Sequence, residues 1–295
     1  KTFYTMITQG TGAVINIILD PILIFGYFGM PRMGIAGAAV ATVIGQIIAA
    51  ILALVFNLKC NRELNISMKG FRPNGHLIVQ IYKVGAPSIV VQAIGSLMTY
   101  GMNLILAAFG SAQTVFGIYF KLQSFVFMPV FGLNNGMVPI IAYNYGAGHK
   151  DRVIKTIKHS VAYGVGIMFV GLLAMHIFPA QLMRMFDAEE SLIAIGAPAL
   201  ETISLSFVFA GFCIVAGSVF QALGNGVYSM IVSVARQMCV LLPVAKLLSL
   251  SGEVTLIWWA FPIAELASVL LTSYFLVRIY RKVICHIGEP VVQDA

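Results

Sequence analysis

Long apolar runs separated by short polar segments make up most of the sequence. Runs of about 20 residues with few charges match the length of a helix that crosses a bilayer. They lack the alternation of apolar and polar positions that marks a barrel strand, and they are longer than one. The pattern predicts eight transmembrane helices near residues 4–28, 33–58, 84–109, 112–139, 159–183, 194–222, 227–250 and 254–277.

Two features of the longest apolar block need a separate interpretation. The block is too long for one helix, and we divide it at Phe109-Gly110-Ser111, where glycine can turn the chain. The segment 128–148 is rich in proline, glycine and asparagine, so we do not expect a rigid straight helix there. Gly132 and Gly136 have the spacing of a close helix contact, and packing is their expected role.

The composition agrees with a membrane protein. Hydrophobic residues make up 59% of the chain and charged residues 10%, against about 25% charged residues in soluble domains. The net charge of +7 would suit nucleic acid only if the basic residues shared one face, and they lie instead in the gaps between apolar runs. The four cysteines form no CxxC pair, which argues against a disulfide scaffold and a zinc site.

The basic residues also predict an orientation, because cytoplasmic loops are enriched in lysine and arginine. With eight spans, the loops on one side of the membrane hold only two basic residues, Arg32 and Arg184. We therefore place both ends of the chain in the cytoplasm. The cytoplasmic side receives 13 basic residues, which are Lys1, Lys59, Arg62, Lys69, Arg72, Lys83, Lys150, Arg152, Lys155, Lys158, Arg278, Arg281 and Lys282.

The polar connection 59–83 divides the chain unevenly. It contains Pro73-Asn74-Gly75 and is the longest polar segment between predicted spans. We interpret it as a cytoplasmic linker between residues 1–58, the last two helices of an amino-terminal lobe, and residues 84–283, a six-helix carboxy-terminal lobe. Residues 284–295 form a cytoplasmic tail.

An internal repeat supports this division. The sequence Ile17–Pro21 resembles Cys239–Pro243 at an offset of 222, and Thr42 aligns with Glu265 at an offset of 223. If the last two spans repeat the first two, the unit is six helices. We then expect twelve helices in two similar lobes, with four helices upstream of this sequence.

Three carboxylates lie inside predicted spans, and insertion scales put the cost of a central Asp at about 2.5–3.5 kcal/mol. Asn16 and Asp20 are four residues apart and share a helical face, and Pro21 frees a backbone carbonyl beside them. The group predicts a proton or sodium site; the alternative is a structural Asp at a helix kink. Glu201, which follows Pro198, is interpreted as structural. The predicted hinges are Pro21, Pro129, Pro139 and Pro243.

Other polar residues within spans are candidates for a substrate cavity. Glu265 is one because it aligns with Thr42. Lys121 could extend outward or act as a counter-charge to a carboxylate, and Arg236 has the position of a clamp between helices. The full set of cavity candidates is Glu265, Lys121, Gln92, Gln123 and Arg236.

Several enzyme signatures are missing from the sequence. It contains no GxxxxGK[ST] loop, no HExxH and no cluster of histidine and cysteine. An enzyme is therefore a remote alternative. The remaining class is transport driven by an ion gradient, with no cofactor or metal beyond a coupling ion, H⁺ or Na⁺.

Several motifs occur in order along the chain: Asn16–Pro21, Gly34–Thr42, Pro139–Ala147, Phe220–Gly224, Arg236-Gln237 before Pro243, and Trp258–Glu265. Together these motifs resemble the MATE (multidrug and toxic compound extrusion) family nearly end to end. The resemblance implies an all-α membrane bundle with two lobes related by a pseudo-twofold repeat, of which this sequence holds helices five to twelve. It also implies an antiporter that exports drugs or organic cations by alternating access.

The resemblance also suggests roles for single residues. Asn16, Asp20 and Thr42 match the polar network of the amino-terminal lobe, in which an aspartate binds the coupling ion. The carboxylates of the sodium-coupled branch, expected near Gly95 and Gly211, are missing. Asp20 is therefore the preferred ion site.

The same resemblance sets the expected surroundings. We expect a monomer in the bacterial cytoplasmic membrane, with lipids and small-molecule drugs as its partners and no nucleic acid. The nearest competing function is a flippase for a lipid-linked precursor. Such a cavity should hold several cationic residues, and only Lys121, Arg236 and Lys246 qualify.

Overall fold

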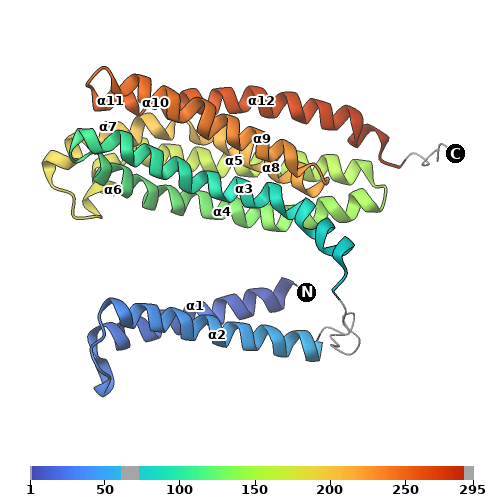
Figure 1. Ribbon diagram of the computed structural model, residues 1–295, viewed down its shortest axis with the longest axis horizontal. Helices are drawn as coiled ribbons and strands as arrows, with labels where there is room; N and C mark the ends of the chain where they lie inside the picture. The colour runs from blue at the N-terminus through green and yellow to red at the C-terminus, as the bar shows by residue number, and fades with distance from the viewer. Residues whose placement is uncertain (1, 61–72, 289–295) are drawn as a thin grey trace. The chain divides into compact units, whose positions relative to one another are not determined.

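The computed structural model describes residues 2–60 and 73–288, and every regular element in these ranges is a helix (Figure 1). Seven of these helices are long and apolar enough to cross a membrane, or eight if one bent pair counts as a span. This confirms the predicted all-α membrane fold. The chain forms two compact units, Lys1–Asn74 (unit 1) and Gly75–Ala295 (unit 2), and each is described by itself.

Unit 1 is a pair of helices, α1 (Thr2–Phe25) and α2 (Ile35–Cys60), joined through the short helix η1 (Tyr27–Gly29). Glycines bring the two backbones unusually close. A Cβ atom on Gly37 would lie 2.5 Å from the carbonyl oxygen of Leu23, and one on Gly45 would lie 2.9 Å from that of Gly12. Only a residue without a side chain fits at such contacts, and these glycines therefore set the distance between α1 and α2.

Unit 2 is a helical bundle (Figure 1). Its longest helices are α3, α4, α5 and α12. In chain order the elements are α3 (Gly75–Leu106), η2 (Ala107–Phe109), α4 (Ala112–Gly146), α5 (Lys150–Ile177), α6 (Pro179–Arg184), α7 (Glu190–Ser204), α8 (Phe207–Ala222), α9 (Gly226–Val234), the π-helix η3 (Ala235–Leu241), α10 (Leu242–Ser249), α11 (Val254–Ile257), α12 (Ala260–Lys282) and η4 (Ile284–His286).

The predicted break between the third and fourth spans is confirmed. Gly110 separates η2 from α4 and has φ +56°, a conformation that favours glycine. The neighbouring boundaries differ from the predicted ones: α3 begins at Gly75, and α4 continues through Pro129 and Pro139 to Gly146. Neither proline ends α4, so segment 128–148 is continuous as a helix up to Gly146, and the expectation that it is not rigid and straight stays a prediction.

Two other predicted spans are interrupted near their middle. Span 194–222 is divided into α7 and α8, which are bent by 48°. Span 227–250 contains the π-helix η3 between α9 and α10, and Pro243 lies in the first turn of α10. A π-helix inside an α-helix often marks a functional position. Apolar periodicity cannot reveal it, because the surrounding residues stay apolar.

Aromatic side chains join α4 to the last helices of unit 2. The ring centroids of Phe116 and Trp258 are 6.5 Å apart, and those of Tyr119 and Phe261 are 5.9 Å apart. All four side chains are buried. Since Phe261 lies one helical turn before Glu265, this cluster fixes the face of α12 that carries the carboxylate.

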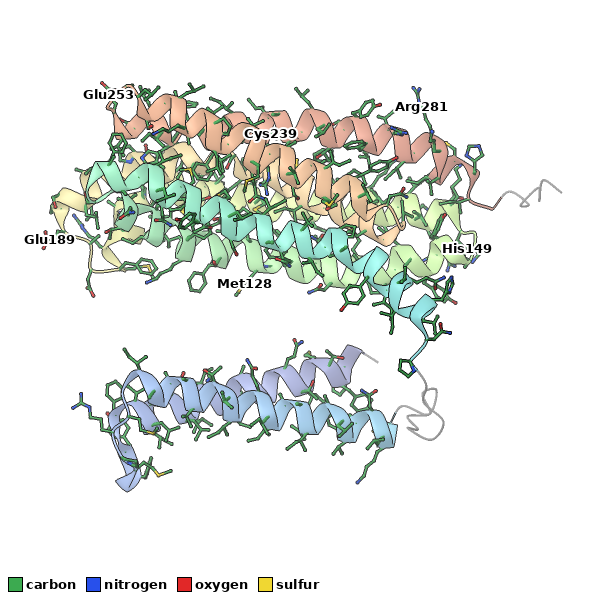
Figure 2. The ribbon with its side chains drawn as sticks, in the orientation of Figure 1. Met128, His149, Glu189, Cys239, Glu253 and Arg281 are labelled. Atoms are coloured by element: carbon green, nitrogen blue, oxygen red, sulfur yellow. The ribbon has the colours of Figure 1, made fainter. Side chains whose placement is uncertain are left out.

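Charged side chains separate to the two ends of unit 2. Figure 2 shows His149 and Arg281 at one end and Glu189 and Glu253 at the other. Lys150 Nζ donates a hydrogen bond of 2.8 Å to the carbonyl oxygen of Cys285, which ties the start of α5 to the end of α12. The basic loops of unit 2 therefore share one end of the bundle.

Candidate functional site

In unit 1, three polar side chains meet between α1 and α2. The orientation of the Asn16 amide that satisfies its neighbours places Nδ2 as a donor 3.2 Å from Asp20 Oδ2. Its Oδ1 then accepts from Thr42 Oγ1 at 3.1 Å. The structure thus brings together the three residues that the sequence analysis grouped as an ion site.

The close approach of the two helices makes this contact possible. Gly45 lies on α2 three residues after Thr42, and a Cβ atom on Gly45 would be 3.6 Å from the Asn16 Cβ atom. A larger residue at position 45 would push α1 away and separate Asn16 from Thr42. Backbone packing and the polar contact are therefore coupled.

The second oxygen of Asp20 lacks a partner. Asp20 Oδ1 is buried and accepts no hydrogen bond from the described part of the chain, and neither of the two ion pairs found there involves Asp20. A buried carboxylate is costly unless a proton, a cation or further donors compensate it. Asn16 and Thr42 are neutral, so their contacts leave the charge of the Asp20 carboxylate without a counter-charge. The chemistry fits a proton or a small monovalent cation.

Unit 2 contains a different arrangement, an ion pair between Arg236 of η3 and Glu265 of α12. Arg236 Nη1 donates to Glu265 Oε1, and the side chains are 28% and 8% exposed. This contact is of the interhelical kind predicted for Arg236. The sequence analysis treated Glu265 separately and missed the pairing; their separation of 29 residues, one helical hairpin, was the available signal.

The other candidates for a cavity are not brought to this pair. Lys121 is exposed, and its Nζ lies 5.5 Å from the ring centroid of Phe186. It forms neither of the ion pairs found among the described residues, so of its two proposed roles the structure favours the outward one. Gln92 and Glu201 are also exposed, and Gln123 is half-buried.

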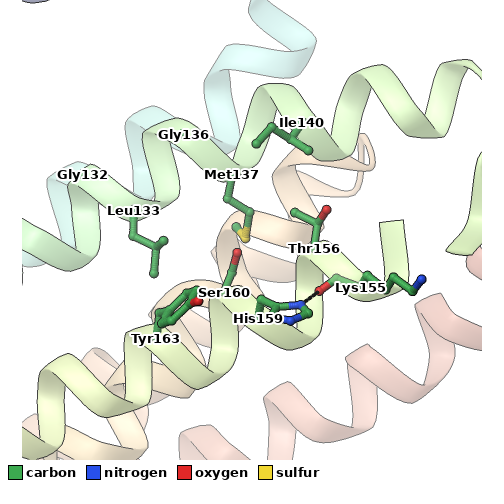
Figure 3. A pocket seen from close by; sticks show the side chains of 10 residues that line it. All are labelled: Gly132, Leu133, Gly136, Met137, Ile140, Lys155, Thr156, His159, Ser160 and Tyr163. Atoms are coloured by element: carbon green, nitrogen blue, oxygen red, sulfur yellow. Dashed lines mark hydrogen bonds between the residues drawn. The ribbon is translucent and has the colours of Figure 1, made fainter. Parts of the chain in front are cut away.

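A groove of about 470 Å³ lies between α4 and α5 (Figure 3). A Cβ atom on Gly132 or Gly136 would meet no described atom within 4 Å, so the expected packing role of these glycines is wrong for this structure. The side chain of Lys155 at the groove suits cationic cargo poorly. The groove is lined by Gly132, Leu133, Gly136, Met137, Ile140, Lys155, Thr156, His159, Ser160 and Tyr163.

A metal centre has no support in residues 2–60 and 73–288. These ranges contain no group of three or more histidine, cysteine, aspartate or glutamate side chains that could hold a metal ion. The candidate chemistry is therefore that of two carboxylates, half-buried Asp20 in unit 1 and buried Glu265 in unit 2.

The sequence of this chain is similar to those of known membrane transporters. The MatE family model matches residues 87–247, more than half of the chain. Multidrug export protein MepA of Staphylococcus aureus (strain bovine RF122 / ET3-1) is 29% identical over 263 residues, covering 88% of this chain and 57% of that protein. MepA of Staphylococcus haemolyticus (strain JCSC1435) is 28% identical over 283 residues, covering 96% and 61%. The chain spans about three fifths of the length of these relatives.

Solved structures show the same helical arrangement. The MATE multidrug transporter DinF-BH, solved in complex with a ligand, matches with a TM-score of 0.80 and 34% identity, covering 93% of this chain and 60% of that chain. A MOP superfamily transporter from Pyrococcus furiosus Vc1 matches with a TM-score of 0.83 and 21% identity, covering 97% and 63%. Because the identity is only 21%, the match to the Pyrococcus furiosus transporter shows a similar fold and nothing about function.

Proposed function

The chain belongs to the MatE family, whose members are transporters rather than enzymes, and we propose that it exports small organic cations in exchange for H⁺ or Na⁺. It is a multi-pass membrane protein, and the bacterial MepA relatives support a location in the plasma membrane. The proposed cycle is alternating access, in which two lobes open in turn to each side. Units 1 and 2 would belong to different lobes.

The observation that carries this proposal is the state of Asp20. Its carboxylate is held by Asn16, has a buried oxygen without a partner and faces no cation of the described chain. A transporter needs such a group, because a coupling ion must bind and leave in every cycle. We therefore propose Asp20 as the coupling site, with Asn16 and Thr42 as the residues that orient it.

The proposed cargo rests on the relatives, and the proposed orientation in the membrane rests on the basic loops. The names of the MepA relatives refer to multidrug export, and we infer drugs and organic cations as the cargo of this chain. Lys150 and Arg281 lie in the basic loops that share one end of unit 2. By the excess of basic residues in cytoplasmic loops, we propose that this end faces the cytoplasm.

The test is export by an Asp20→Asn variant in a bacterial host that lacks its own drug pumps. The complete gene is expressed, and cellular accumulation of ethidium and of a fluoroquinolone is measured. Wild-type protein should lower accumulation, whereas Asp20→Asn should leave it at the level of the empty host. Asp187→Asn, an exposed change of the same chemistry, should behave as wild type.

Two outcomes would contradict the proposal. If the Asp20→Asn variant exports at the wild-type level, Asp20 is not the coupling site. Unchanged drug accumulation together with a build-up of undecaprenyl-linked precursor in a deletion strain would favour the flippase. The structure gives that alternative little support, since Arg236 is paired with Glu265 and Lys121 lies beside Phe186.

A further inference from the structure

The proposed cycle gives no role to the ion pair of unit 2, which joins half-buried Arg236 to buried Glu265. Glu265 is nine-tenths buried, and Arg236 shields one of its two oxygens. The other, Oε2, is buried without a partner in the described part of the chain. Removing a carboxylate from water costs several kcal/mol, which a proton, further hydrogen-bond donors or a close opposite charge must offset, and the described residues supply only the opposite charge. The guanidinium is therefore the main compensation for this carboxylate.

Within residues 2–60 and 73–288, no second cationic side chain is found near the pair to replace Arg236. The other ionisable groups within electrostatic range are Tyr119 of α4 and Cys213 of α8. Both are neutral in their ordinary state at neutral pH. Cys213 Sγ in turn accepts hydrogen bonds from the Ser268 and Thr272 hydroxyls at 3.4 and 3.6 Å. Without Arg236, Glu265 would be a buried carboxylate surrounded by neutral groups.

The backbone of η3 contributes to the placement of Arg236. This π-helix runs from Ala235 to Leu241 between two α-helical segments. One extra residue in a helical turn rotates the side chains on one side of it by about 100° relative to those on the other. The position of Arg236 relative to Pro243 is thus a product of the π-helix.

Unit 1 also holds a carboxylate between two helices, but its described partners are neutral. Thr42 and Glu265 occupy aligned positions in the sequence repeat, and each lies on the second helix of its pair. In unit 1 the neighbouring carboxylate, Asp20, is held by neutral groups; in unit 2 the carboxylate is held by a guanidinium.

We propose that Arg236 is a tethered cation that permanently occupies a cation site at Glu265, and that its removal uncovers this site for a small monovalent cation. Unit 2 then adds no exchangeable ion to the transport cycle. The inference rests on the proposed function only in treating Asp20 as the exchangeable site of unit 1.

The test measures cation binding by thermal unfolding of the purified protein in detergent. All variants carry Asp20→Asn, so that unit 1 contributes no site. The probes are millimolar guanidinium chloride and sodium chloride, with choline chloride as the control at the same ionic strength. Arg236→Ala leaves a space of the size of the lost side chain, and we expect guanidinium or Na⁺ to raise its melting temperature by about 3 °C.

Two further variants show whether the rise belongs to Glu265. Arg236→Ala combined with Glu265→Gln should show no rise, because the carboxylate is gone. Arg236→Lys keeps a charge on the chain and should also show none. A rise that survives Glu265→Gln, or no rise in folded Arg236→Ala, would overturn the proposal.

Loss of folding is also informative. If Arg236→Ala folds only in the presence of guanidinium or Na⁺, the proposal is supported. If Arg236→Ala stays unfolded with both probes while the double variant with Arg236→Ala and Glu265→Gln folds, Glu265 accepts no free cation and the proposal fails. If the double variant is unfolded too, Arg236 is required for packing, and this result also overturns the proposal. Since no readout here is transport, these results are independent of the export test on Asp20.

Discussion

Units 1 and 2 each hold a carboxylate with a buried oxygen, and they compensate its charge in different ways. The Asp20 carboxylate accepts a hydrogen bond from the Asn16 amide, which in turn accepts one from the Thr42 hydroxyl. Glu265 is held by the guanidinium of Arg236. The described partners of the carboxylate are therefore neutral in unit 1, whereas in unit 2 they include a full counter-charge.

This difference separates a structural charge from an exchangeable one. A paired buried charge is stable only while its partner stays in place. A carboxylate with neutral partners can take up and release a cation without breaking an ion pair of the chain. Under the two proposals made above, ion exchange belongs to unit 1 and a fixed charge to unit 2.

The largest expected effect is on stability. Glu265→Ala leaves the Arg236 guanidinium without its partner and should lower the free energy of unfolding by about 3–5 kcal/mol. Asp20→Asn should change it by less than about 1 kcal/mol, because the asparagine oxygen can still accept from Asn16 and Oδ1 has no described partner to lose. Denaturation followed by circular dichroism measures both, with the exposed Glu253→Ala as control. Equal losses at positions 20 and 265 would remove the distinction between the units.

The next effect concerns the packing that holds the site of unit 1 together. Gly37→Ala would place a Cβ atom 2.5 Å from the Leu23 carbonyl oxygen and should cost about 1–3 kcal/mol as α1 and α2 move apart. Gly10→Ala meets no described atom within 4 Å and should be neutral or slightly stabilising. Melting temperature and ethidium export are the measurements. If both alanines were equally tolerated, close packing would not set the geometry of the site.

A smaller effect is expected from Asn16, which donates to Asp20 Oδ2. A hydrogen bond to a charged group contributes at least about 1.5 kcal/mol, so Asn16→Ala should lower the export rate by at least about tenfold. The matched control is Asn135→Ala, an exposed amide on α4. Dye efflux from preloaded cells gives the rate. Unchanged efflux in Asn16→Ala would mean that the amide does not hold the carboxylate during transport.

The smallest effect should come from Thr42. Its hydroxyl lies 3.1 Å from the Asn16 amide and 2.9 Å from the Ala38 carbonyl oxygen, so it has an alternative acceptor. Thr42→Val should weaken export about fivefold, equivalent to about 1 kcal/mol, while Thr42→Ser should keep most of it. The coupling-ion concentration for half-maximal export is the readout. A serine variant as impaired as the valine variant would point to the methyl group rather than the hydroxyl.

Much of the architecture could be predicted from the sequence because lipid imposes simple rules. Apolar length marks the spans, and the glycine at position 110 marks the break before α4. Asn16 and Asp20 could be grouped because residues four apart share a helical face, which is a local property. The start of α3 at Gly75 and the continuation of α4 through Pro139 depend on packing partners, and hydropathy does not report these.

The sequence by itself determined an all-helical membrane protein, the approximate positions of its spans, and the carboxylates that carry a cost inside them. The tertiary structure decided how each carboxylate is compensated. The close approach at Gly45 brings Thr42 to Asn16, and the π-helix η3 helps bring Arg236 to Glu265. The physical reason is that burial cost depends on residue type and depth, which the sequence shows. Compensation depends on contacts between helices, which only the fold creates.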